Sequence, residues 1–173
     1  MTQAIDERDP KPTADFTVAV EVDASPAEAF DAVSHPRAWW SRDIIGDADR
    51  LGAEFEFEVE GIHYSRQRIS EFVPGERVVW DVVEARLTFV ADEDEWVGTS
   101  IRFDIRPLDG GRSEVRFTHV GLRPDVECYD ACSTAWQSFI TGSLRRLVET
   151  GTGTPNQEES GEFAEVAGRL RQH

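Results

Sequence analysis

Two cysteines and two histidines are the residues whose types and spacing come closest to a reactive site. Cys128 and Cys132 lie four residues apart in a segment of helical pattern, so they share one helical face. His119 ends the strand before this segment, and His63 lies earlier in the chain. Two thiols and two imidazoles match a common zinc ligand set, but structural zinc sites place paired cysteines at turns, and this chain has no second pair. We therefore predict no metal and no cofactor, with Cys132 as a small buried apolar residue and Cys128 at the border of a cavity.

The same residues suggest a second chemistry, nucleophilic catalysis. Cys128 lies near the predicted start of a helix, where the positive end of the helix dipole lowers a thiol pKa. If His119 lay within hydrogen-bond reach, the two would resemble a Cys–His pair. The spacing reveals no third residue that would orient the histidine, so we favour His119 as a polar group at the mouth of a ligand pocket.

Charged residues on two further segments are weaker candidates. The three glutamates of segment 54–59 alternate with apolar residues. This pattern indicates the solvent-exposed face of a strand rather than an acid/base pair. Arg66 and Arg68 share a face with Tyr64 on the next predicted strand. Solvent exposure is the default for both arginines, although either would pair with a ligand carboxylate if it pointed inward.

Composition indicates a folded, acidic protein of one domain. The chain has 173 residues, 39% of them hydrophobic and 10% aromatic, which suffices for a sizeable core. Its apolar runs fall short of the roughly 20 residues that span a bilayer, its start lacks the pattern of a signal peptide, and it has two cysteines, so we expect a cytoplasmic location. The net charge of −16 opposes binding to nucleic acid or to anionic membranes. An ordinary acidic surface and adaptation to high salt both explain this charge.

The hydrophobic pattern predicts a sheet followed by a long helix. Period-two alternation, with turns at Glu60-Gly61, Pro74-Gly75 and Asp109-Gly110-Gly111, predicts antiparallel strands. These strands cover 16–22, 54–59, 62–72, 78–83, 99–105 and 113–119. Ser25-Pro26-Ala27-Glu28 has the sequence of a capping box and predicts a first helix, and a short helical turn with Trp39 and Trp40 follows it.

The long helix is predicted to begin after Pro124 with Asp125 as its cap, and to end at Gly151. Together these elements divide the chain into a loose arm over 1–14, a domain over 15–151 and an extension over 152–173. Within the extension, Phe163, Val166, Ala167 and Leu170 recur at the spacing of a short amphipathic helix.

Aromatic residues on the inward faces of these elements predict the lining of a pocket. A mostly apolar cavity with a few polar groups is the usual form of a small-ligand site. The residues that we expect to line it are Phe55, Phe57, Tyr64, Trp80, Phe103, Phe117, His119, Cys128, Tyr129, Cys132 and Trp136.

Several segments together resemble the superfamily of START-related, polyketide-cyclase-like domains, and within it the bacterial group named after the activator of Hsp90 ATPase. The resemblance covers about 16–151 and is carried by 25–30 (SPAEAF), 39–40 (WW), 72–80 (FVPGERVVW), 98–103 (GTSIRF) and 135–151. It implies an α+β helix-grip fold: a curved antiparallel sheet of six or seven strands wrapped on a long C-terminal helix, with two small helices after the first strand. Members bind lipids, sterols, polyketides or hormones in the cavity, and some are enzymes.

Three functions follow as hypotheses. The first is binding of a small hydrophobic, aromatic or lipid-like molecule in the cavity between the sheet and the long helix. The second is an enzyme of the cyclase, aromatase or hydrolase kind, with His119 as acid/base and Tyr129 as hydrogen-bond donor. The third is a co-chaperone-like interaction module. Formation of a homodimer is a further alternative. An inward-pointing His119 with a connected cavity favours the first two, and a filled core with an exposed apolar patch favours the third.

Overall fold

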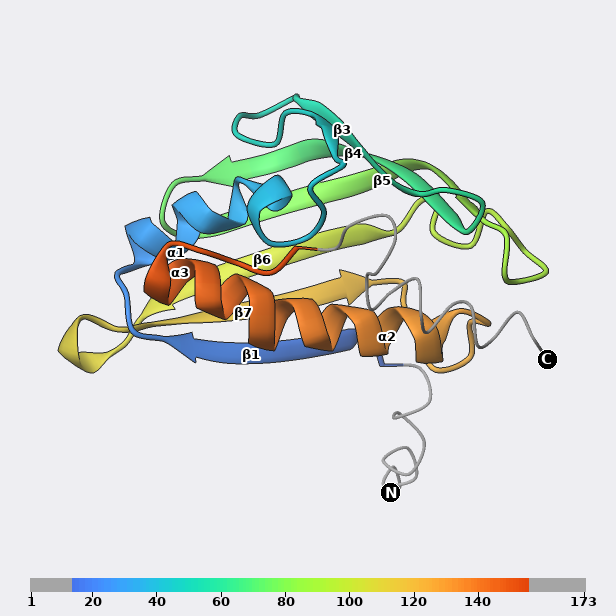
Figure 1. Cartoon of the computed structure of the whole chain (residues 1–173). Helices are drawn as coiled ribbons and strands as arrows, with labels where there is room; N and C mark the ends of the chain where they lie inside the picture. Colours follow the sequence, from blue (N-terminus) through green and yellow to red (C-terminus); the bar gives the residue numbers. More distant parts are fainter. Residues whose placement is uncertain (1–13, 156–173) are drawn as a thin grey trace, which may run out of the picture.

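The structure is a computed structural model that describes residues 14–155. Its centre is one antiparallel sheet of seven strands in the order β1-β7-β6-β5-β4-β3-β2, with helices on one face of it (Figure 1). The strands are β1 (Phe16–Val22), β2 (Ile45–Gly46), β3 (Glu54–Val59), β4 (His63–Val73), β5 (Arg77–Leu87), β6 (Ser100–Pro107) and β7 (Ser113–Val120). The helices are α1 (Pro26–Val33), α2 (Tyr129–Ser138) and α3 (Arg145–Thr150), and short 3-10 turns cover Pro36–Ala38 and Asp109–Gly111. The predicted fold class is confirmed.

Alternating side chains make one face of the sheet apolar. On β6 and β7 the register places Phe103 opposite Phe117 and Ile101 opposite His119, so their side chains lie on the same face. All four are fully buried. The register between β4 and β5 shifts at two places, and such irregularities bend strands and curve a sheet. The curved sheet thereby presents one apolar face to the helices.

The first helix forms as its sequence predicts. Glu28 N–H donates to Ser25 Oγ at 3.2 Å, and Ser25 N–H donates to Glu28 Oε1 at 2.9 Å, which is a complete capping box. Pro26 occupies the first helical position, where its missing N–H costs nothing. The 3-10 turn Pro36–Ala38 follows and delivers Trp39 and Trp40 to the apolar face.

The long C-terminal helix begins later than predicted. It runs from Tyr129 to Thr150 through a π-helical segment, Phe139–Leu144, that joins α2 to α3. Asp125 is not its cap. Instead Glu95 accepts hydrogen bonds from the backbone N–H groups of Glu127, at 2.7 Å, and Cys128, at 3.1 Å. The predicted end at Gly151 is confirmed, since this residue has the left-handed conformation with φ of 86°.

The predicted arm over 1–14 and the amphipathic segment around Phe163 to Leu170 lie outside the described residues, apart from residue 14. Among residues 14–155, none of the helices has the length and apolar character needed to span a membrane.

Candidate functional site

Five tryptophans fill the space between the sheet and the long helix. They come from four places in the chain: Trp80 from β5, Trp96 from the loop after β5, Trp136 from α2, and Trp39 and Trp40 from the residues after α1. All five are at most 2% exposed. We call them the tryptophan cluster.

The rings of the tryptophan cluster lie against one another. Trp40 stacks on Trp80 with ring centroids 5.9 Å apart and an interplanar angle of 9°, and Trp39 stacks on Trp80 at 6.3 Å and 19°. Trp136 contacts Trp40 at 4.8 Å and stacks on Trp96 at 6.1 Å. Aromatic pairs of this kind add to the stabilisation that their burial gives. The interior that we expected to hold a ligand is therefore closely packed with rings.

His119 is hydrogen-bonded through both of its ring nitrogens. The indole N–H of Trp136 donates to Nδ1 at 3.1 Å, which makes Nδ1 the acceptor and puts the proton on Nε2. Nε2 then donates to Thr99 Oγ1 at 2.8 Å, and Thr99 Oγ1 donates to the carbonyl of Trp96 at 2.7 Å. The imidazole thus joins α2, β7 and the loop after β5. Neither nitrogen is left to exchange a proton with a substrate in this conformation.

Trp96 lies between two buried histidines. Its ring meets the edge of His63 at a centroid distance of 4.5 Å and that of His119 at 4.8 Å. Burial lowers the pKa of His119 to about 3, and burial together with the nearby His119 lowers the pKa of His63 to about 3. Both imidazoles are consequently neutral at pH 7.

Several polar atoms in this interior have no protein partner. The indole N–H groups of Trp39, Trp80 and Trp96 find no acceptor among the described residues, and Gln67 Oε1 finds no donor there. Each of these four side chains is at most 2% exposed. Buried polar groups are nearly always hydrogen-bonded, because an unmade bond costs about 1–3 kcal/mol. Three unpartnered donors and one unpartnered acceptor in one core call for a specific explanation.

Most of the predicted lining residues lie in this interior. Phe55, Phe57, Trp80, Phe103, Phe117, His119, Cys128, Cys132 and Trp136 are all fully buried. Tyr129 is half-buried at the start of α2, where its ring meets Phe16 on β1, at a centroid distance of 6.4 Å.

Tyr64 is the exception and corrects our expectation. It lies on the outer face of β4, beneath the guanidinium of Arg86 at 5.7 Å, because the inward residues of that strand are His63, Ser65 and Gln67. Arg66 and Arg68 share this outer face. Arg66 pairs with Glu54 and Glu84, both at 2.9 Å, so no ligand carboxylate is needed to neutralise it.

The cysteine pair does not form an activated nucleophile. Cys128 and Cys132 are both free thiols and fully buried. The adjacent Cys132 thiol, burial and the Glu95 carboxylate all raise the pKa of Cys128, opposite to the lowering that its place near the helix start suggested. Residues 14–155 contain no group of three or more His, Cys, Asp or Glu side chains placed to hold a metal ion.

Five buried residues of this interior are missing from the lining predicted from the sequence: Trp39, Trp40, Trp96, His63 and Gln67. Trp96 directly follows an acidic loop of four carboxylate residues, 92–95, yet its ring lies against both histidines. The residue type alone would have identified Trp96. Tryptophan side chains are usually well buried, and the four acidic residues before Trp96 cannot bury it, so its ring has to pack on residues that are distant in the sequence.

The same acidic loop supplies a testable cap. Replacing Glu95 with Ala removes the acceptor for two backbone N–H groups at the start of the long helix, and we expect a loss of about 1–2 kcal/mol in the free energy of unfolding. Urea unfolding measures it. Glu93→Ala, which changes an exposed side chain in the same loop, is the control, and equal losses in both variants would contradict the assignment.

Solved structures share this architecture. The Aha1 protein from Colwellia psychrerythraea, whose structure is that of a dimer, matches with a TM-score of 0.65 and 24% identity over 81% of this chain and 99% of that one. CalU16 from Micromonospora echinospora matches with a TM-score of 0.55 and 16% identity over 90% and 83%. DynU16, from the dynemicin biosynthetic locus, matches with a TM-score of 0.55 and 17% identity over 79% of this chain and 48% of that one.

No family model and no curated protein matches the sequence. The structural likeness agrees with the resemblance seen in the sequence, and at these identities it establishes the fold. The chain therefore has the helix-grip fold of the Colwellia Aha1 protein, CalU16 and DynU16.

Proposed function

We propose that the protein binds a small, flat, mostly apolar molecule that carries hydrogen-bond acceptors, within the tryptophan cluster. The observation that carries this proposal is the set of unpartnered indole N–H groups of Trp39, Trp80 and Trp96. A carbonyl or ring-oxygen acceptor on the ligand would satisfy such donors, and the faces of the indoles suit a planar ring. Gln67 Oε1 would accept from a hydroxyl or N–H group on the same ligand.

Binding in this place requires the cluster to open. The rings are in contact, so a ligand has to displace at least one of them, and the residues that supply Trp39, Trp40 and Trp96 are loops and turns rather than strands. Loop-borne groups move at lower cost than groups on the central strands. We infer that these three indoles move and that Trp80, which pairs with Ile69 on β4 and Ile101 on β6, stays in place.

A matched pair of ligands tests the acceptor requirement. 9-Fluorenone and fluorene share one ring system and differ by a carbonyl in place of a methylene. We expect 9-fluorenone to bind with one molecule per chain and about tenfold more tightly, because one additional buried hydrogen bond contributes about 1.4 kcal/mol. Titration followed by tryptophan emission and calorimetry measures both affinities.

Single substitutions locate the donor. Trp39→Phe, Trp80→Phe and Trp96→Phe each keep an aromatic ring and remove the indole N–H, so at least one of them should reduce the preference for 9-fluorenone to near unity. Equal affinity of the two compounds for the unaltered protein would contradict the proposed role of the indoles. Binding of neither compound would contradict the proposal as a whole.

The closed packing favours a second candidate, an interaction module. A filled core needs no small ligand, and the hydrogen bonds of His119 hold the long helix to the sheet as a rigid unit. A homodimer is one form that this function would take, as in the Colwellia Aha1 structure. Sedimentation equilibrium across a hundredfold range of concentration, in a protein that binds neither fluorene compound, would support it.

A further inference from the structure

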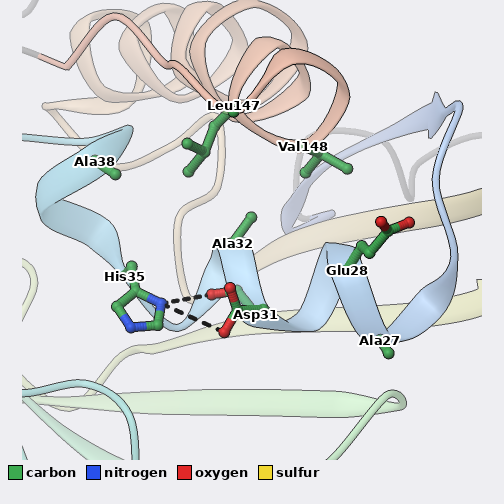
Figure 2. Close-up of a pocket in the computed structure, with 9 residues that line it drawn as sticks. Ala27, Glu28, Asp31, Ala32, His35, Ala38, Leu147 and Val148 are labelled. Carbon is green, nitrogen blue, oxygen red and sulfur yellow. Dashed lines mark hydrogen bonds and ion pairs between the residues drawn. The ribbon is translucent and has the colours of Figure 1, made fainter.

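A groove between α1 and α3 lies apart from the tryptophan cluster. It has a volume of about 680 Å³ and nine lining residues: Ala27, Glu28, Asp31, Ala32, His35, Ala38, Leu147, Val148 and Gly151. Figure 2 shows Leu147 and Val148 extending from α3 toward α1, with Ala32 facing them. Three alanines and a glycine leave room that larger side chains would have filled. The groove thus has an apolar centre with no side chain of residues 14–155 inserted in it.

The described chain passes this groove shortly before it ends. Gly151 closes α3 and lines the groove, and Gly153 packs so closely on the carbonyl of Ala38 that a Cβ there would collide with it. Thr154 N–H donates to Ser143 Oγ at 2.8 Å, and Ser143 Oγ donates to the carbonyl of Trp39 at 2.7 Å. Residues 151–154 are therefore held in place, with Gly151 and the Gly153 contact to Ala38 at the groove, and the described chain ends at Pro155.

The 18 residues that follow carry one apolar stripe. Phe163, Val166, Ala167 and Leu170 recur at offsets of three, four and seven, which is the pattern of an amphipathic helix. Phe163 to Leu170 would span about 12 Å as a helix, which is also the length of the eight-residue α1. The connection over 156–162 reaches up to roughly 23 Å when extended, so the stripe can return to the groove.

We propose that residues 163–170 dock as a helix into the groove between α1 and α3 of the same chain. Charge is favourable at the C-terminal end of the segment, where Arg169 and Arg171 flank Leu170 and the groove presents the carboxylates of Glu28 and Asp31. Tethering favours this occupant further, since a short linker holds the segment at an effective concentration of about millimolar. Nine lining residues fall well below the 20–30 per side of a stable interface between two proteins.

Paramagnetic relaxation in the full-length chain tests the proposal. A nitroxide is attached at Gln172→Cys, a site that reacts selectively because Cys128 and Cys132 are buried. We expect the amide signals of Ala32 and Leu147 to be lost and those of Arg106 and Glu114, on the sheet strands, to remain. Adding Phe163→Ser and Leu170→Ser to the labelled chain should restore the lost signals, whereas Glu165→Ser, on the other face of the stripe, should not.

Two results would overturn the proposal. One is full signal intensity at Ala32 and Leu147 in the labelled chain, or signal loss that the double substitution leaves unchanged. The other comes from mixing ¹⁵N-labelled chains that carry no nitroxide with unlabelled chains that carry it. Signal loss at the groove in that mixture would assign it to a second copy of the chain.

Discussion

Lowering the pH from 6 to 4 is expected to reduce the free energy of unfolding of this protein by about 5 kcal/mol. His63 and His119 have a pKa of about 3 in the folded chain because they are buried, against 6.5 for an ordinary histidine. Between pH 6.5 and pH 3 the two histidines are therefore protonated in the unfolded chain but not in the folded chain. Their contribution to the free energy of unfolding is fully present above pH 6.5 and is lost as the pH falls toward 3. Each histidine contributes a loss of about 1.4 kcal/mol per pH unit.

The combined effect is large compared with the stability of a single domain. Two histidines lose about 2.7 kcal/mol per unit, or about 5 kcal/mol between pH 6 and pH 4, against a typical total of about 5–15 kcal/mol. The Glu54 carboxyl affects the free energy of unfolding at a lower pH than the two histidines do. Hydrogen bonds from Arg68 and Arg66 lower the pKa of its carboxyl below 4.5, so its contribution is lost only below that pH.

The slope of stability against pH is the measurement that distinguishes these groups. Urea unfolding at half-unit steps from pH 4.5 to 7 should give a slope that falls by about half in His63→Gln, whatever the absolute stability of that variant. Val97→Ala, which alters an exposed apolar side chain and no titrating group, should keep the full slope. An unchanged slope in His63→Gln would show that its imidazole is not held neutral.

Replacing Trp136 is expected to have the second large effect. Its ring contacts Trp40 at 4.8 Å and Phe117 at 4.7 Å, and its N–H donates to His119 at 3.1 Å. Trp136→Ala creates a cavity at the centre of the tryptophan cluster and leaves Nδ1 of a buried histidine without its donor. We expect a loss of about 3–5 kcal/mol in the free energy of unfolding from the cavity, and about 1–3 kcal/mol more from the orphaned nitrogen.

Trp136→Phe separates the two contributions. Phenylalanine retains much of the ring and loses the donor, so its cost should lie near the smaller figure, about 1–3 kcal/mol. Val97→Ala, at a side chain that is 46% exposed, should change stability by less than about 0.5 kcal/mol. Equal losses for Trp136→Phe and Val97→Ala would indicate that the hydrogen bond to His119 contributes nothing. Affinity for 9-fluorenone should also fall in Trp136→Ala.

The fold was predictable because its signals are local. Three kinds of signal depend only on residues that are close together in the sequence, so they can be recognised there. These are the alternation over 54–59 and 113–119, the Asp109-Gly110-Gly111 turn and the capping box at Ser25. The strand Ile45–Gly46 is too short to leave such a pattern. Asp125 failed as a cap because Glu95, 30 residues away in the sequence, supplies the acceptor.

The candidate site was predictable only in part, for the same physical reason. Phe103, Phe117 and Trp136 follow from the faces of their strands and helix, and the structure buries all three. The pairing of His119 with Trp136 and Thr99, and the place of Trp96 between two imidazoles, depend on contacts across the fold. The prediction for Tyr64 was wrong because aromatic residues on strands are usually buried. Here the ring lies on the outer face of the sheet, against the guanidinium of Arg86.

The pairing of β1 with β7 sets an order for folding during synthesis. Phe16 lies opposite His119, so the first strand is made about a hundred residues before β7, its only strand neighbour within residues 14–155. Until β7 leaves the ribosome, β1 exposes the apolar face of Phe16, Val20 and Val22, which are buried in the finished protein. Contacts of such long range slow folding and leave unpaired edges open to association. The nascent chain should therefore depend on chaperones that shield an early apolar strand, and refolding from denaturant should be slow.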